Sequence, residues 1–163
     1  MDSTPTRDPD AARRRVRLSR AARESLRELS TQMFLLNHKV SGHVDLRPVD
    51  LQCLDLVVLH GPLSPRALAR RAGLHPATLT GILDRLEGGG WVARERDASD
   101  RRAVVIRFVG DRISEILRLY SGMNESMRQI FAGYREDELE VIADFLRRTA
   151  DAGRKANDEL ASP

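Results

Sequence analysis

The chain has few of the residues that build disulfide frameworks, metal centres or membrane spans. Of its 163 residues, only Cys53 is a cysteine and 4% are aromatic. One cysteine excludes an internal disulfide and a cysteine-rich zinc site. No apolar run approaches the ~20 residues of a membrane helix, and the first residues lack a signal-peptide pattern. These absences predict a cytoplasmic protein without membrane contact, and the length fits one domain of one or two lobes.

Charge is unevenly distributed along the chain, although its formal net value is only +3. Residues 1–20 hold six arginines against three acids, and residues 55–107 hold nine arginines against six acids. Residues 108–163 are acidic, with eight basic against eleven acidic side chains. Basic segments of this kind are expected where a chain approaches a polyanion. A solvated arginine-rich surface would give the same pattern, so charge alone leaves both interpretations open.

Helical periodicity dominates both ends of the chain. Apolar residues spaced by three and four predict amphipathic helices over about 19–40, 111–134 and 136–155, the first of them ended by Gly42. Residues 1–18 form either a basic tail or a helical extension. Because Asp10 can cap a run of good helix formers, we favour an extension that begins near Asp10.

The middle of the chain predicts short helices followed by a hairpin. Pro48 begins one helix, Ser64 and Pro65 suit the cap and first position of another over 65–72, and Gly73 ends it. The next helix covers about 76–87 and stops at three glycines. Residues that favour strands at 91–96 and 103–108 then predict a hairpin. Helix, tight turn, helix and hairpin form the layout of a winged helix-turn-helix, whose second helix enters the major groove of DNA.

The helix over 76–87 has a surface suited to a groove. Its core-facing positions are apolar: Leu79, Ile82, Leu83 and Leu86. Its outward positions are small or polar, which permits close approach and hydrogen bonds to bases or phosphates: His75, Pro76, Ala77, Thr78, Thr80, Gly81 and Arg85. The alternative is a solvated helix face on which Arg85 pairs with Asp84 or Glu87.

From Gly61 to Phe108 the chain resembles the MarR family of transcriptional regulators. The resemblance lies in Gly-Pro-Leu-Ser-Pro-Arg-Ala-Leu-Ala, Leu-His-Pro-Ala-Thr-Leu-Thr-Gly-Ile-Leu-Asp-Arg-Leu-Glu and Arg-Asp-Ala-Ser-Asp-Arg-Arg. The last is the most specific, since the family's wing typically ends its loop in Asp-Arg-Arg. With the flanking helices the resemblance covers about residues 20–158. It implies a mainly α fold, with a winged helix-turn-helix at 47–109, a dimerisation lobe from helices at 19–46 and 110–158, and a short tail at 159–163.

The resemblance also implies a function and its residues. The implied protein is a homodimeric repressor, not an enzyme, that binds an inverted repeat in double-stranded DNA without a cofactor and is released by a small aromatic or phenolic ligand. Asp100 would orient Arg102 in the wing. The expected DNA contacts are Ser64, Arg66, His75, Pro76, Ala77, Thr78, Thr80, Gly81, Arg85, Arg101 and Arg102. The expected dimer contacts are Leu26, Leu29, Met33, Ile142 and Leu146, and His38, Trp91 and Arg112 are guesses for a ligand pocket.

The chain departs from the family at several helix starts. His75 replaces the common Ser or Thr cap of the recognition helix, where a ring nitrogen can still accept a hydrogen bond. Arg47 and Val109 likewise stand where a capping Thr is common. Gly81 replaces a larger side chain, so base readout at that position is expected to differ.

Other chemistries find less support in the residues. No two of the four histidines lie three or four apart in one helix, so no metal site is expected. Cys53 lies between Leu51 and Leu54 in an apolar stripe, which is typical of a cysteine that acts as a small hydrophobe. No catalytic motif is present. The open alternatives are a winged-helix protein-interaction module and a redox- or metal-responsive regulator of the same fold.

Overall fold

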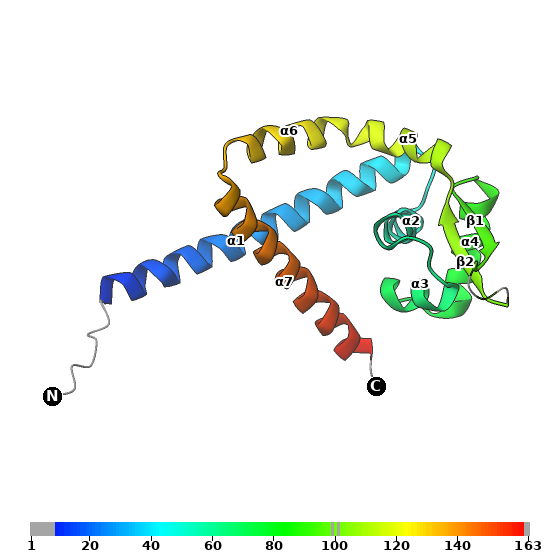
Figure 1. The fold of residues 1–163 in the computed structure, drawn as a ribbon, viewed down its shortest axis with the longest axis horizontal. Coiled ribbons are helices and arrows are strands. Elements are labelled where there is room, and N and C mark those ends of the chain that lie inside the picture. The colour runs from blue at the N-terminus through cyan, green and yellow to red at the C-terminus, as the bar shows by residue number, and fades with distance from the viewer. Residues whose placement is uncertain (1–8, 99, 101, 162–163) are drawn as a thin grey trace. The chain divides into compact units, whose positions relative to one another are not determined.

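The computed structural model describes residues 9–98, 100 and 102–161 (Figure 1). No helix of this part is long and apolar enough to cross a membrane. The chain divides into two units, residues 1–39 and 40–163. The elements follow one another as α1 (Pro9–His43), α2 (Pro48–His60), α3 (Pro65–Ala72), α4 (Pro76–Gly88), β1 (Val92–Arg96), β2 (Val104–Phe108), α5 (Gly110–Leu119), α6 (Ser121–Ala132) and α7 (Glu136–Ala161).

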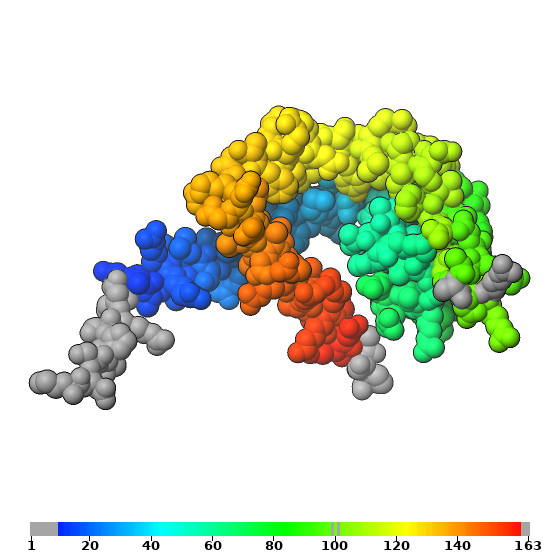
Figure 2. Space-filling model, viewed as in Figure 1, coloured from blue at the N-terminus to red at the C-terminus, as the bar shows by residue number. Residues whose placement is uncertain are grey.

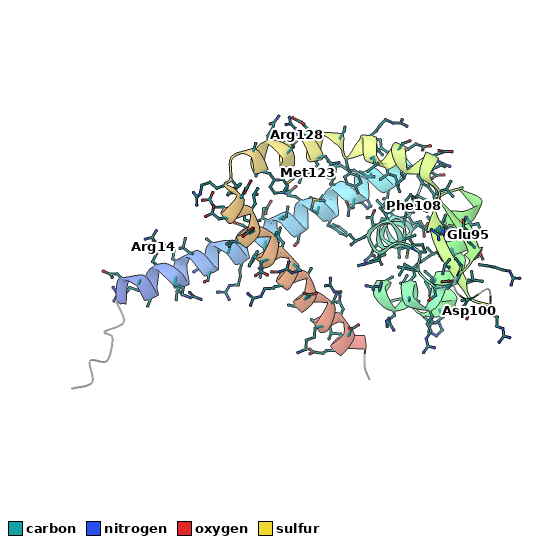
Figure 3. The ribbon with its side chains drawn as sticks, in the orientation of Figure 1. Arg14, Glu95, Asp100, Phe108, Met123 and Arg128 are labelled. Carbon is teal, nitrogen blue, oxygen red and sulfur yellow. The ribbon has the colours of Figure 1, made fainter. Side chains whose placement is uncertain are left out.

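The first unit contains α1 up to Lys39. This helix begins at Pro9, so residues 9–18 of the basic segment are helical, and residues 1–8 lie outside the described residues. Asp10 lies in the first turn, where a negative charge interacts favourably with the helix dipole. The labelled Arg14 lies on this helical segment in Figure 3. α1 ends at His43, one residue after Gly42, so the predicted end holds to within one residue.

The second unit holds the winged domain, in which α2, α3 and α4 pack with a two-stranded sheet. β1 and β2 are antiparallel, with Val92 opposite Phe108 and Arg96 opposite Val104. Leu63 adds a bridge to Ile106, with hydrogen bonds of 3.2 and 2.8 Å in the two directions. In Figure 2 the atoms of the winged domain, drawn from teal to green, pack against one another.

The expected helix over 111–134 is two helices in the structure. α5 ends at Leu119 and α6 begins at Ser121, with Tyr120 between them. The Ser121 hydroxyl donates to the Arg118 carbonyl at 2.7 Å, and such a back-bond, followed by Gly122, weakens a regular helix at this point. α7 extends beyond the expected end at Lys155 to Ala161.

The core lies within the winged domain and its borders. Every side chain buried in the described part of the chain falls between Val40 and Ile116. Those that are less than 2% exposed and largest come from α2, α3, α4 and the sheet: Leu51, Leu54, Leu68, Leu79, Ile82, Leu86 and Ile106. The helix-turn-helix is therefore held by its own apolar core.

Candidate DNA-binding surface

Local capping fixes the first helix of the helix-turn-helix. The Ser64 hydroxyl accepts a hydrogen bond from the Ala67 amide at 3.2 Å, and Pro65 occupies the first helical position. Gly73 ends α3 with a φ of 65°, a left-handed conformation that glycine adopts without strain. α3 therefore begins and ends where the sequence predicts.

The second helix, α4, begins at a histidine cap. Nδ1 of His75 accepts from the Ala77 amide at 3.3 Å, so the ring replaces the hydroxyl cap in the expected way. Arg47 and Val109, the other two departures, make no side-chain cap, yet α2 and α5 begin directly after them. Pro48 at the start of α2 supplies a preset φ in place of that cap.

α4 buries one face and exposes the other. Leu79, Ile82, Leu83 and Leu86 are each at most 2% exposed. The opposite face carries the small and polar residues of the expected DNA contact, all of them exposed except the half-buried Gly81: Pro76, Ala77, Thr78, Thr80 and Gly81. The Thr80 hydroxyl donates to the Pro76 carbonyl at 3.1 Å, which leaves its lone pairs facing outward as acceptors. This face can approach a groove closely.

The structure does not show the alternative pairing of Arg85 within its own helix. Instead of pairing with Asp84 or Glu87, Arg85 forms a two-pronged ion pair with Asp50 of α2, with Nε–Oδ2 and Nη2–Oδ1 distances of 3.1 and 2.7 Å. The hydrogen bond to Asp50 raises the pKa of Arg85. Because its guanidinium is engaged with α2, we do not count Arg85 among the base contacts proposed below.

Asp84 and Glu87, the alternative partners of Arg85, bind Arg94 of β1 instead. Its guanidinium donates to Asp84 at 2.7 Å and also pairs with Glu87, whose carboxylate accepts the Arg94 backbone amide at 3.2 Å. The bond to Asp84, with the charge of Glu87 adding to it, raises the pKa of Arg94. These contacts attach the first strand of the wing to α4.

The wing loop is shaped by aspartates. Asp100, labelled at the hairpin in Figure 3, accepts the backbone amide of Arg102 at 3.0 Å, and its own amide donates to Asp97 at 3.3 Å. Asp100 therefore acts on the backbone of the turn that carries Arg102. The Arg102 side chain is exposed, and Arg101 lies outside the described residues.

A cavity of about 500 Å³ lies beside the Asp50–Arg85 pair. The Arg112 guanidinium stacks 4.0 Å from the centre of the Trp91 ring and donates to the Gly89 carbonyl at 2.6 Å. Among the described residues, Nε of Arg112 is buried without a hydrogen-bond partner. Two of the three guessed ligand residues, Trp91 and Arg112, thus share this cavity, while His38 belongs to the first unit. The remaining lining residues are Val44, Asp45, Leu46, Arg47, Asp50, Arg85 and Gly89.

The single cysteine is buried in the core of α2. Cys53 has no exposed surface, and burial, with Asp50 adding, raises the pKa of its thiol to about 11. Because the thiolate is the reactive form, this environment disfavours redox chemistry. In the part of the chain that the structure describes, no cluster of three metal-ligating side chains occurs.

Sequence reasoning missed Asp50 and Arg94. Asp50 had a signal, because it stands four residues before Leu54 and seven before Val57, on the apolar face of α2. A carboxylate on such a face needs a buried cation. Arg94 gave no comparable signal, since alternation in a short hairpin does not show which helix a strand contacts.

A helix-turn-helix with an exposed polar second helix, next to a hairpin that carries arginine, defines a winged helix-turn-helix DNA-binding protein. Residues 46–104 match the family model described as MarR family. The uncharacterized HTH-type transcriptional regulator YcgE of Bacillus subtilis is 34% identical over 137 residues, which are 84% of this chain and 89% of YcgE. The chain belongs to the MarR family of transcriptional regulators.

Solved structures agree on the fold. A MarR family protein from Bacillus stearothermophilus superposes with a TM-score of 0.62 at 20% identity, covering 83% of this chain and 95% of that one. A mutant of MepR from Staphylococcus aureus, bound to an oligodeoxyribonucleotide, gives a TM-score of 0.53 at 19% identity, covering 80% of this chain and 96% of that one.

Proposed function

We propose that the protein is a homodimeric, sequence-specific repressor that binds an inverted repeat through α4 and the wing and is relieved by a small ligand. The observation that carries the proposal is the exposed face of α4, small and polar, opposite a fully buried apolar face. The major groove, which is ~12 Å wide, admits an α-helix, and small and polar outward side chains let the helix approach the base edges closely.

The proposed contacts divide into readout and positioning. On α4, Thr78 and Thr80 offer hydroxyls to base edges, and His75, Pro76, Ala77 and Gly81 permit close approach. Ser64 and Arg66, at the start of α3, would bind phosphates. Arg101 and Arg102 of the wing would reach a flanking minor groove, whose negative potential attracts guanidinium groups.

The dimer is proposed on the apolar side chains that one chain leaves exposed. Of the expected contacts, Leu29 and Leu146 are each 43% exposed, and Leu26, Met33 and Ile142 are half-buried. On α7, Val141 is 70% exposed. Exposed apolar side chains on each of these helices are what an interface would cover. Sedimentation at micromolar concentration should give the mass of two chains, and the mass of one chain would refute the dimer.

Two symmetric recognition helices imply half-sites about one helical turn, ~10 base pairs, apart. An operator of this form that overlaps a promoter excludes polymerase, so repression is the proposed sign. A protein with this activity would act on the nucleoid in the cytoplasm.

The test begins with duplexes that the protein selects from a random pool. We expect an inverted repeat whose affinity falls steeply with salt. Thr78→Glu, which places a negative charge on the outward face of α4, should weaken binding at least about tenfold, whereas Ser126→Glu on the exposed surface of α6 should not. Failure to select any duplex would favour the protein-interaction alternative.

For the ligand we propose the cavity lined by Trp91 and Arg112. Trp91 and Arg112 line this cavity, with Arg112 stacked on the ring and paired with Glu115 at 3.2 Å. An aromatic ring beside a cation suits a small aromatic or phenolic compound. A phenolic compound that raises the melting temperature and releases the operator should lose both effects in Arg112→Met. If the variant responds like the wild type, the ligand binds elsewhere.

A further inference from the structure

The ion pair between Asp50 and Arg85 joins the framework of the winged domain to α4 across 35 positions of sequence. Asp50 lies in the first turn of α2, and its side chain is 2% exposed. Arg85 lies in the last turn of α4 and is 39% exposed. The pair therefore has one end inside the core and the other at the surface.

The geometry of the pair restrains rotation as well as distance. Two parallel N–H···O bonds between a planar guanidinium and a carboxylate fix the relative orientation of both groups. Thr78, Gly81 and Arg85 follow one another at spacings of three and four, so they share one flank of α4. A β-carbon added at Gly81 would stand 3.7 Å from Nη1 of Arg85.

The other flank of α4 is held separately. Asp84 precedes Arg85 by one residue, about 100° around the helix, and pairs with Arg94 of the wing. α4 is thus held on one flank by α2 and on the other by β1.

We propose that Asp50 is a positioning residue for DNA recognition: through Arg85 it sets the rotation of α4, and hence which side chains meet the base edges. The inference rests on the proposed role of α4 as the recognition helix. Asp50 itself, being buried in α2, does not contact DNA under this proposal.

The sign of the effect separates positioning from bulk electrostatics. Asp50→Asn removes a negative charge near a polyanion, so electrostatics alone would strengthen DNA binding. Loss of positioning would instead weaken binding to the correct sequence, by about tenfold if the misfit is worth one mismatched base pair. Binding to unrelated DNA would stay unchanged or become tighter.

The experiment measures fluorescence anisotropy at several salt concentrations with two duplexes: the repeat that the wild-type protein selects, and a scrambled version of it. Asp50→Asn should lower the ratio of the two affinities about tenfold. Asp111→Asn, which removes the same charge from an exposed position in α5, should leave the ratio within twofold. Thr78→Glu tests α4 itself. If Thr78→Glu leaves the affinity for the selected repeat unchanged, the proposed function is refuted. If only Asp50→Asn leaves the ratio of affinities unchanged, only this inference is refuted.

A double-variant cycle tests whether Asp50 acts through Arg85. In the Arg85→Gln background, Asp50→Asn should change the ratio by less than twofold, because the pair is already broken. If Arg85 instead contacted phosphate directly, Arg85→Gln would lower the salt slope by about one and weaken both duplexes, which would overturn the proposal. If Asp50→Asn does not fold, Arg85→Lys takes its place, because it keeps the positive charge but cannot form the two parallel hydrogen bonds of the guanidinium. It should likewise lower the ratio of the two affinities, and an unchanged ratio would refute the inference.

Discussion

Replacing Arg94 by methionine removes the ion pairs that attach the wing to α4 and keeps most of the apolar stem. The Arg94 side chain is 30% exposed, whereas those of Glu87 and Asp84 are 39% and 61% exposed. The bond from the Arg94 backbone amide to Glu87 does not need the guanidinium. The substitution therefore measures the contribution of the guanidinium to the wing.

The magnitude follows from these exposures. The pair with Asp84, mostly in solvent, contributes about 0.2–1 kcal/mol, and the more protected bond to Glu87 contributes about 1–1.5 kcal/mol after allowance for screening. Removal of the cation also leaves two carboxylates one turn apart near the negative end of α4, which costs a few tenths of a kcal/mol. The total loss in the free energy of unfolding is about 1.5–2.5 kcal/mol, or a fall of roughly 3–10 °C in Tm.

Urea unfolding, followed by circular dichroism, measures this loss. Arg107→Met is the matched control, because Arg107 on the neighbouring strand pairs with Glu95 at 2.8 Å between two half-exposed side chains. That control should cost less than about 0.5 kcal/mol. A double-mutant cycle of Arg94→Met with Glu87→Gln should give a coupling energy of about 1 kcal/mol. Equal losses for Arg94→Met and Arg107→Met would refute the reasoning.

Three further predictions concern the wing, the thiol and a helix end. Arg102→Ala should weaken DNA binding and lower the salt slope by about one while leaving the dimer intact; an unchanged slope would argue against the wing. Cys53, with a pKa of about 11, should be about one part in a thousand thiolate at pH 8, whereas an ordinary thiol is roughly one quarter thiolate. Iodoacetamide should therefore label the native protein at least about a hundredfold more slowly than the urea-unfolded protein. Equal labelling rates would support the redox alternative. Gly73→Ala, at a φ of 65°, should lower the free energy of unfolding by about 1 kcal/mol. Gly88→Ala, where an added β-carbon meets open space, should be neutral or stabilise by up to about 0.5 kcal/mol. Equal destabilisation by both substitutions would contradict the backbone argument.

The helix-turn-helix could be predicted because its boundaries are chemically marked. Ser64 and Pro65 mark the start of α3, Gly73 its end, and Pro76 the start of α4, and each of these residues acts through its own backbone or an amide within three residues. Periodicity then placed Leu79 and its neighbours in the core. Local signals suffice wherever the structure depends on local bonds.

The ion pairs could not be predicted in the same way. Sequence neighbours offered only Asp84 and Glu87 as alternative partners for an Arg85 expected at DNA, yet its partner Asp50 lies 35 positions away. Only the packing of α2 against α4 brings the two groups together. The break at Tyr120 escaped prediction for a related reason, since the apolar stripe continues through it and only a side-chain bond of Ser121 marks it.

The distribution of burial separates two kinds of stability in the chain. The winged domain buries its own apolar core, and its buried Asp50 pairs with Arg85 of the same domain. The long helices lack this property: Phe34 on α1 and Val141 on α7 are 68% and 70% exposed, and no side chain of α6 is buried. Helices with such faces gain most of their stability from packing, so under the proposed dimer their order would depend on the second copy. A ligand that altered that packing would then change the spacing of two rigid winged domains without disturbing either core, which is the property that a releasable repressor needs.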